Sequence, residues 1–66
     1  MKIQVNGESY ELADGATVAD LLARLELTGK FVAVERNRQV VSFRTFADTA
    51  LADGDQLEVV TLVGGG

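Results

Sequence analysis

The chain has 66 residues, a net charge of −4 from ten acidic and six basic side chains, and no Cys, His, Pro or Trp. Without Cys there is no disulfide framework and no thiolate nucleophile. Without His there is no His-based triad, and together the two absences exclude a zinc site. This length holds one domain, and a composition that is 47% hydrophobic argues against disorder. The acidic balance disfavours nucleic-acid and membrane-surface partners.

The first twelve residues have the pattern of a β-hairpin. Ile3-Gln4-Val5 alternates apolar and polar residues, and Tyr10-Glu11-Leu12 does so again. Asn6-Gly7, between them, favours the positive φ angles of a type I′ turn. We therefore expect two antiparallel strands, with Asp14-Gly15 closing the unit.

One amphipathic helix is expected over residues 17–27. Its apolar stripe falls at Val18, Leu21, Leu22 and Leu25. Thr17 suits the N-cap, where Asp20 can complete a capping box, and Gly29 fits the left-handed position at the C-terminal end. Because a helix of about 11 residues is marginal alone, its stripe must pack on a sheet.

The second half of the chain predicts three further strands. Residues 31–35 have the pattern of a buried strand, residues 36–38 that of a polar turn, and residues 39–41 that of a short edge strand. Residues 42–51 are expected to be irregular, with room for a helical turn. A tight turn at residues 53–55 then leads to the final strand, residues 57–62.

This order of elements predicts an α+β fold in which a mixed sheet packs on one main helix. The β-grasp (ubiquitin-like) fold has this order and size, and its last strand lies beside the first and parallel to it. A ferredoxin-like fold fits less well because its second helix is missing. We expect residues 1–62 to form the domain and residues 63–66 to form a flexible Gly-rich tail.

The tail is the first candidate functional segment. Gly64, Gly65 and Gly66 carry no side chains, so their backbone can enter a narrow channel, and Gly66 would carry an α-carboxylate that is ionised at neutral pH. Such a carboxylate can attack the α-phosphate of ATP, and the mixed anhydride can then accept sulfide or a persulfide. The alternative is an idle, frayed end.

The last strand supplies a candidate docking surface. Alternation places Leu57 and Val59 in the core, and Val60 and Leu62 on the exposed face immediately before Val63 and the tail. Exposed apolar residues often mark protein contacts. The alternative is that residues 42–51 fold over Val60 and Leu62.

The remaining polar residues are weaker candidates. Asp53, Asp55 and Glu58 can steer the tail towards a basic, ATP-binding partner, although an ordinary solvated surface is the stronger reading. The pattern lacks the ligands of a calcium loop, and no metal site is expected. Tyr10 is expected to be a core or rim aromatic. No nucleophile–base pair can be assembled, so we do not expect a complete enzyme.

The chain resembles the sulfur carrier proteins of thiamine biosynthesis over essentially its whole length. The resemblance lies in the helix 17–22, the strand 32–35, and the segment 51–60 running into Val63-Gly64-Gly65-Gly66. It implies that an E1-like adenylyltransferase activates Gly66 with ATP, with no cofactor bound by the chain itself. It further implies that a cysteine desulfurase or relay supplies sulfur, and that thiazole synthase receives it from the thiocarboxylate.

Family members commonly have Pro and Trp where this chain has Ser42 and Phe46, which leaves the role of segment 36–46 open. Three alternatives stay open: a sulfur carrier subunit of molybdopterin synthase, a ubiquitin-like binding module without sulfur, and a modifier conjugated to lysines. No apolar run of signal-peptide length begins the sequence and none is long enough to span a bilayer, so a cytoplasmic location is expected.

Overall fold

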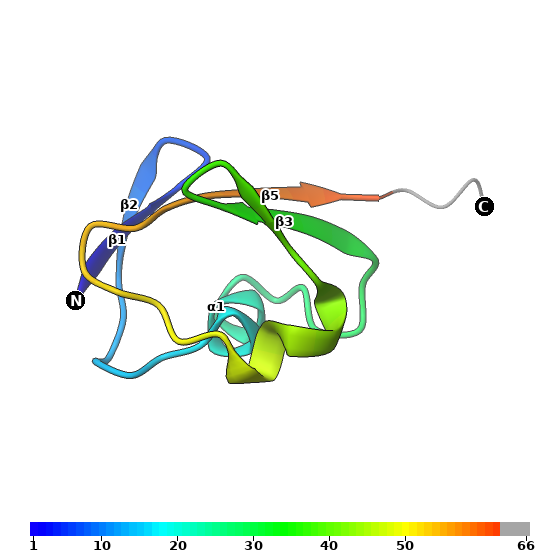
Figure 1. Ribbon diagram of the computed structural model, residues 1–66, viewed down its shortest axis with the longest axis horizontal. Coiled ribbons are helices and arrows are strands. Elements are labelled where there is room, and N and C mark those ends of the chain that lie inside the picture. The colour runs from blue at the N-terminus through cyan, green and yellow to red at the C-terminus, as the bar shows by residue number, and fades with distance from the viewer. Residues whose placement is uncertain (63–66) are drawn as a thin grey trace.

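The computed structural model describes residues 1–62, which form a five-stranded mixed sheet with its helices on one face (Figure 1). This α+β arrangement is the predicted one. In chain order the elements are β1 (Lys2–Val5), β2 (Glu8–Glu11), α1 (Val18–Arg24), β3 (Val32–Arg36), β4 (Gln39–Val41), the 3₁₀ helix η1 (Phe43–Asp48) and β5 (Gln56–Thr61).

The last strand lies in the centre of the sheet. The strand order is β2-β1-β5-β3-β4, with β5 parallel to β1 and antiparallel to β3. Both the parallel pairing of first and last strands and the edge position of β4 confirm the sequence predictions. The strand that leads towards the tail is therefore held by neighbours on both sides.

Two tight turns connect the antiparallel pairs. Asn6 and Gly7 have φ angles of 51° and 84°, which is the predicted geometry for a two-residue hairpin turn. The turn between β3 and β4 is built from Asn37 and Arg38, at φ angles of 50° and 70°. Arg36 belongs to β3 and not to this turn, so the predicted boundary was wrong by one residue.

Strand β3 is less buried than the sequence suggested. It begins one residue later than predicted and leaves Phe31 outside the strand, with 79% of its surface exposed. Only Val34 is fully buried, because alternate residues point to the open face of the sheet. Strand β5 likewise starts and ends one residue earlier than predicted.

Helix α1 begins as predicted and ends early. The Thr17 hydroxyl accepts a bond from the Asp20 backbone N–H, and the Asp20 carboxylate accepts one from the Thr17 N–H, which completes the capping box. The helix ends at Arg24, and Glu26, at φ 60°, takes the left-handed position assigned to Gly29. Bonds from Glu26 N–H to the Ala23 carbonyl and from Leu27 N–H to the Leu22 carbonyl form a Schellman motif.

The hydrophobic core lies between α1 and the sheet. Tyr10 is half-buried at the margin of this core, as predicted. Phe46 of η1 is also partly buried and packs against the core. No helix within residues 1–62 is both long and apolar enough to cross a membrane. The buried core residues are Ile3, Val5, Val18, Leu21, Leu22, Val34, Leu51, Leu57 and Val59.

Candidate functional site

The chain leaves the sheet at a defined point. Strand β5 ends at Thr61, and the Leu62 N–H still donates a 2.8 Å hydrogen bond to the carbonyl of Phe31. The predicted sites at Val63, Gly64, Gly65 and Gly66 lie outside the described residues. Leu62, the last described residue, is thus held by a backbone hydrogen bond to the segment that precedes β3.

The two faces of β5 are those predicted by its alternation. Leu57 and Val59 are buried, and Glu58 points to solvent. Val60 and Leu62 remain 56% and 52% exposed, so segment 42–51 does not bury them. Their exposure is confirmed, while their role in docking stays a prediction.

Val60 belongs to the open face of the sheet, opposite α1. Its cross-strand partner is the exposed Ala33, and the exposed Val40 lies on the same face of the neighbouring edge strand. Glu58 lies directly opposite Glu35 on the same face. Two carboxylates in register repel each other, and a cation supplied by a partner would relieve that repulsion.

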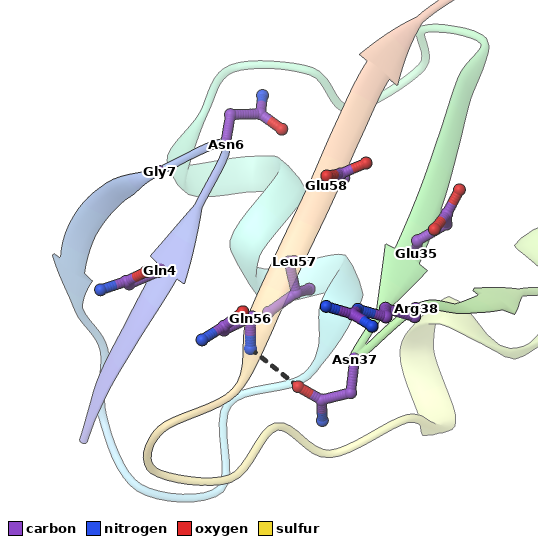
Figure 2. A pocket seen from close by; sticks show the side chains of 9 residues that line it. All are labelled: Gln4, Asn6, Gly7, Glu35, Asn37, Arg38, Gln56, Leu57 and Glu58. Atoms are coloured by element: carbon purple, nitrogen blue, oxygen red, sulfur yellow. Dashed lines mark hydrogen bonds between the residues drawn. The ribbon is translucent and has the colours of Figure 1, made fainter.

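A shallow, polar pocket of about 270 Å³ occupies the same face beside the glutamate pair. Figure 2 shows Gln4 and Asn6 on the β1 side of this pocket, Glu58 on the central strand β5, and Glu35 and Arg38 on the β3 side, with α1 behind the sheet. Its walls hold amides and charged groups but no nucleophile beside a general base. The pocket therefore offers hydrogen-bonding and charged groups but no catalytic pair.

The acidic turn before β5 has a structural role that was not predicted. Asp55 is only 6% exposed, and its carboxylate accepts hydrogen bonds from Arg36, Asn37 and the Ala52 backbone N–H at 2.8, 3.0 and 2.8 Å. Burial of the carboxylate opposes its ionisation, but these three bonds outweigh it, so the pKa of Asp55 lies below its ordinary value.

The proposed steering of the tail by this acidic turn is therefore wrong. Asp53 accepts a bond from the Lys2 backbone N–H, and Asp55 is paired with Arg36. Both aspartates lie at the start of β5, and a six-residue strand places the start about 20 Å from the end. Only Glu58 of the predicted acidic group lies on the exposed face near Val60.

A second exposed apolar surface was missed from the sequence. Phe31 and Phe43 are 79% and 71% exposed, and together with Leu62 they border an apolar groove of about 410 Å³. Phe31 was assigned to a buried strand and Phe43 to irregular chain, so neither was considered as surface. Hereafter "the groove" means the hollow lined by Gly29, Lys30, Phe31, Val32, Phe43, Phe46 and Leu62.

Among residues 1–62 no group of three or more His, Cys, Asp or Glu side chains is placed to hold a metal ion. This part of the chain offers two exposed surfaces, one on the open face along the central strand and one beside the end of that strand.

The sequence of this chain is similar to sequences of one known protein family. The model of the ThiS family matches residues 3–66. The chain is 38% identical to the sulfur carrier protein ThiS of Bacillus subtilis, over 97% of this chain and 98% of that protein. It is 42% identical to a thiazole synthase of Paramagnetospirillum magneticum over all of this chain, but it spans only 20% of that enzyme's length.

The solved structures agree with this family match. The crystal structure of the thiamine biosynthesis protein ThiS from Geobacter metallireducens has a TM-score of 0.82 and 33% identity, with 100% of both chains covered. Fold, length of match and sequence therefore agree with one another. The chain belongs to the ThiS family.

Proposed function

We propose that this protein is a sulfur carrier that donates sulfur for the thiazole ring of thiamine. The observation that carries the proposal is the central β5, which leads without a linker into Val63-Gly64-Gly65-Gly66. Membership of the ThiS family and the identity to a protein named as a sulfur carrier support it. In this role the chain is a co-substrate of other enzymes.

The chemistry takes place at the carboxylate of Gly66. An oxygen of this carboxylate attacks the α-phosphorus of ATP on an activating enzyme, forming an acyl adenylate and releasing pyrophosphate. Sulfide then displaces AMP and gives the thiocarboxylate directly. A persulfide donor gives an acyl disulfide instead, whose S–S bond a thiol cleaves while becoming oxidised to a disulfide.

The folded domain contributes access and orientation. Gly64 and Gly65 present no side chain to a narrow channel, and the anchored Leu62 fixes where the channel entrance must lie. Val63 to Gly66 spans at most about 13 Å. The receiving active site must therefore lie within that distance of the end of β5.

The open face of the sheet suits the activating enzyme. An enzyme that binds ATP places cations around the triphosphate, and Glu35 and Glu58 offer complementary charge beside Val60. The sulfur donor, a cysteine desulfurase or relay, and the thiazole synthase complete the proposed set of partners. The proposal sets these encounters in the cytoplasm.

Intact-mass spectrometry tests the proposed function. Incubation with the activating enzyme, ATP and sulfide should raise the mass by the difference between one sulfur and one oxygen. Deletion of Gly66 should abolish this change and leave the melting temperature unaltered, because the core lies within residues 1–62. Glu8→Gln, at an exposed position on the edge strand β2, is the control and should load normally.

Two other outcomes would contradict the proposal. An unchanged mass with an active activating enzyme would exclude sulfur carriage, and isopeptide-linked adducts would identify a modifier. Deletion of the gene should produce a growth defect that thiamine rescues. Rescue only by restored molybdoenzyme activity would assign the carrier to molybdopterin synthesis.

A further inference from the structure

The groove lies at the point where the described part of the chain ends. Leu62 forms part of its wall, and the Leu62 N–H bonds to the carbonyl of Phe31, which lines the same hollow. In Figure 1 the segment before β3 and the start of η1 lie at the end of the molecule towards which β5 runs. The residues that follow in the sequence, Val63 and three glycines, are therefore tethered covalently to the wall of the groove.

The register of β3 and β5 gives the direction in which the chain continues. The bond from Leu62 to Phe31 extends this antiparallel register past the last strand pair. One further step in the same register would set Val63 opposite Lys30, which also lines the groove. Because alternate side chains of a strand share a face, Val63 would fall on the side where Val59 is buried, which is the side of α1 and η1.

The interior of the groove is apolar and its rim is open to solvent. Phe46 and Val32 are partly buried and pack against the core, whereas Phe31 and Phe43 are exposed. An aliphatic side chain that entered the groove would cover aromatic surface that otherwise faces water, which is favourable. Val63 is the one apolar side chain that residues 63–66 can offer.

The groove continues along the segment that would lie opposite the glycines. A second hollow of about 170 Å³ shares Gly29, Lys30 and Phe46 with the groove and is also lined by Thr28. The segment from Lys30 back to Thr28 thus borders both hollows in turn. A glycine backbone suits such a narrow continuation because it carries no side chains.

The charges beside the groove are positive, in a protein that is acidic overall. Lys30 lines the groove, and the Arg44 guanidinium lies 5.7 Å from the centre of the Phe43 ring. Neither side chain forms an ion pair with any of residues 1–62. The α-carboxylate of Gly66 has the complementary charge, and the glycines before it adopt φ angles of either sign, so the chain end can turn back towards Lys30.

We propose that the groove holds the tail of this chain, residues 63–66, with Val63 against the aromatic side chains and the Gly66 carboxylate beside Lys30 and Arg44. This inference rests on the proposed function, which makes Gly66 the reacting chain end, and deepens it by giving that end a docked resting state. An enzyme then gains the carboxylate by displacing the tail. Since the tail is tethered beside the groove, docking needs no second molecule and does not depend on protein concentration.

Nuclear magnetic resonance of the unmodified, full chain tests the proposal. Nuclear Overhauser contacts should join the Val63 methyl groups to the rings of Phe31 and Phe43. Backbone order parameters of Val63 and Gly64 should exceed about 0.6 in the parent and fall below that value in F31S/F43S. Val40→Ser, which removes an apolar side chain of similar exposure on the open face, should leave both observations unchanged. Thermal unfolding of F31S/F43S should match the parent, which separates docking from folding.

The ionic contact is tested by titrating the Gly66 carboxyl group. Neighbouring cations lower the pKa of a carboxyl group, so this pKa should be higher in K30Q/R44Q than in the parent, by about half a unit or more. K2Q/R38Q removes one lysine and one arginine away from the groove and should leave the pKa near the parent value. Equal changes in the two double variants would show an effect of net charge and overturn the proposal.

Valine replacement tests which segment occupies the groove. Val63→Ser should lower the order parameter of Gly64 as F31S/F43S does, and the combined variant should lower it no further, because both changes remove one contact. Additive losses would overturn the proposal. Low order parameters in the parent, without contacts from Val63 to the rings, would overturn it as well and leave the groove to another protein.

The remaining outcomes separate this inference from the other possibilities. Contacts between differently labelled molecules that grow with concentration would assign the groove to a second copy and overturn the proposal. A docked tail on a chain that acquires no thiocarboxylate would remove the carrier function and leave the docking intact. A thiocarboxylate that forms on a chain without these contacts would remove the docking alone.

Discussion

The side-chain amide of Asn6 pairs with the backbone of Val59 as a strand residue would. Its Nδ2 donates to the Val59 carbonyl at 3.0 Å, and its Oδ1 accepts from the Val59 N–H at 2.9 Å. The backbone of Asn6 has already turned away at φ 51°. The amide therefore continues the contact between β1 and β5 one step past the end of β1, towards the site.

Removing this amide should loosen the central pair of strands. Asn6→Gly keeps the positive φ but leaves the Val59 N–H and carbonyl without their partner, so we expect a loss of about 1–3 kcal/mol in the free energy of unfolding. Urea denaturation measures it. Asn6→Ala should lose about 1 kcal/mol more, because alanine disfavours the left-handed region. Equal stability of Asn6→Gly and the parent would show that water replaces the amide.

The pKa of Asp55 predicts how stability depends on pH. It is lower in the folded chain than in the unfolded one, so the unfolded state binds the proton more readily. The contribution of the ionised Asp55 to the free energy of unfolding is fully present above the unfolded pKa of about 3.9. It declines as the pH falls through the pKa of Asp55 in the folded chain. Asp55→Asn should lose about 1.5–3 kcal/mol at pH 7 and progressively less as the pH falls below the unfolded pKa of about 3.9, as followed by urea denaturation. A pH-independent difference would contradict this.

Neighbouring residues on β5 should respond oppositely to the same substitution. Val59→Asp buries a carboxylate at a position that is 8% exposed and should unfold the domain. Val60→Asp should leave the melting temperature almost unchanged and raise the Kd for the activating enzyme. Circular dichroism and a binding titration measure the two effects. Unfolding by Val60→Asp would show that the open face is covered in solution.

The like-charged pair Glu35 and Glu58 should lower the stability of the fold while favouring association with the activating enzyme. Glu58→Lys replaces a like-charge pair by an opposite one and should stabilise the fold by about 0.2–1 kcal/mol. It should also slow association with the activating enzyme and reduce the salt dependence of the rate. Glu8→Lys makes the same charge change at an exposed position on β2. A similar loss of rate in both variants would point to net charge alone.

Glu26 offers a stabilising substitution. It holds the left-handed position after α1, so Glu26→Gly should raise the free energy of unfolding by about 0.4–1 kcal/mol. Ala23→Gly, within the last turn of the helix, should lower it by up to about 1 kcal/mol. Thermal melts of the two variants measure the contrast, and a destabilised Glu26→Gly would show that the Glu26 side chain itself contributes.

The sequence predicted features that depend on near neighbours and missed those that depend on distant ones. The capping box of Thr17 and the alternation of β5 are local patterns, and both were correct. The buried network of Asp55 needs partners 18 and 19 residues away, so its Asp-Gly turn was read as surface. The early end of α1 depends on Leu27 turning back to Leu22, where Gly29 offered the more familiar signal.

The same limit explains the candidate site. Exposure of Val60 and Leu62 followed from their phase on one strand. The groove is assembled from three segments that meet only in the folded chain, so no local pattern in the sequence shows it. The chemistry assigned to Gly66 rests on residue type and on the family resemblance.

The central position of β5 has a mechanical consequence. Hydrogen bonds in a sheet run nearly perpendicular to the strands, so a pull along β5 from beyond Leu62 strains the bonds to β1 and β3 together. Such shear loading resists force better than peeling, in which bonds break one after another. An enzyme that draws in the chain end can therefore tug on it without unravelling the domain that delivers it.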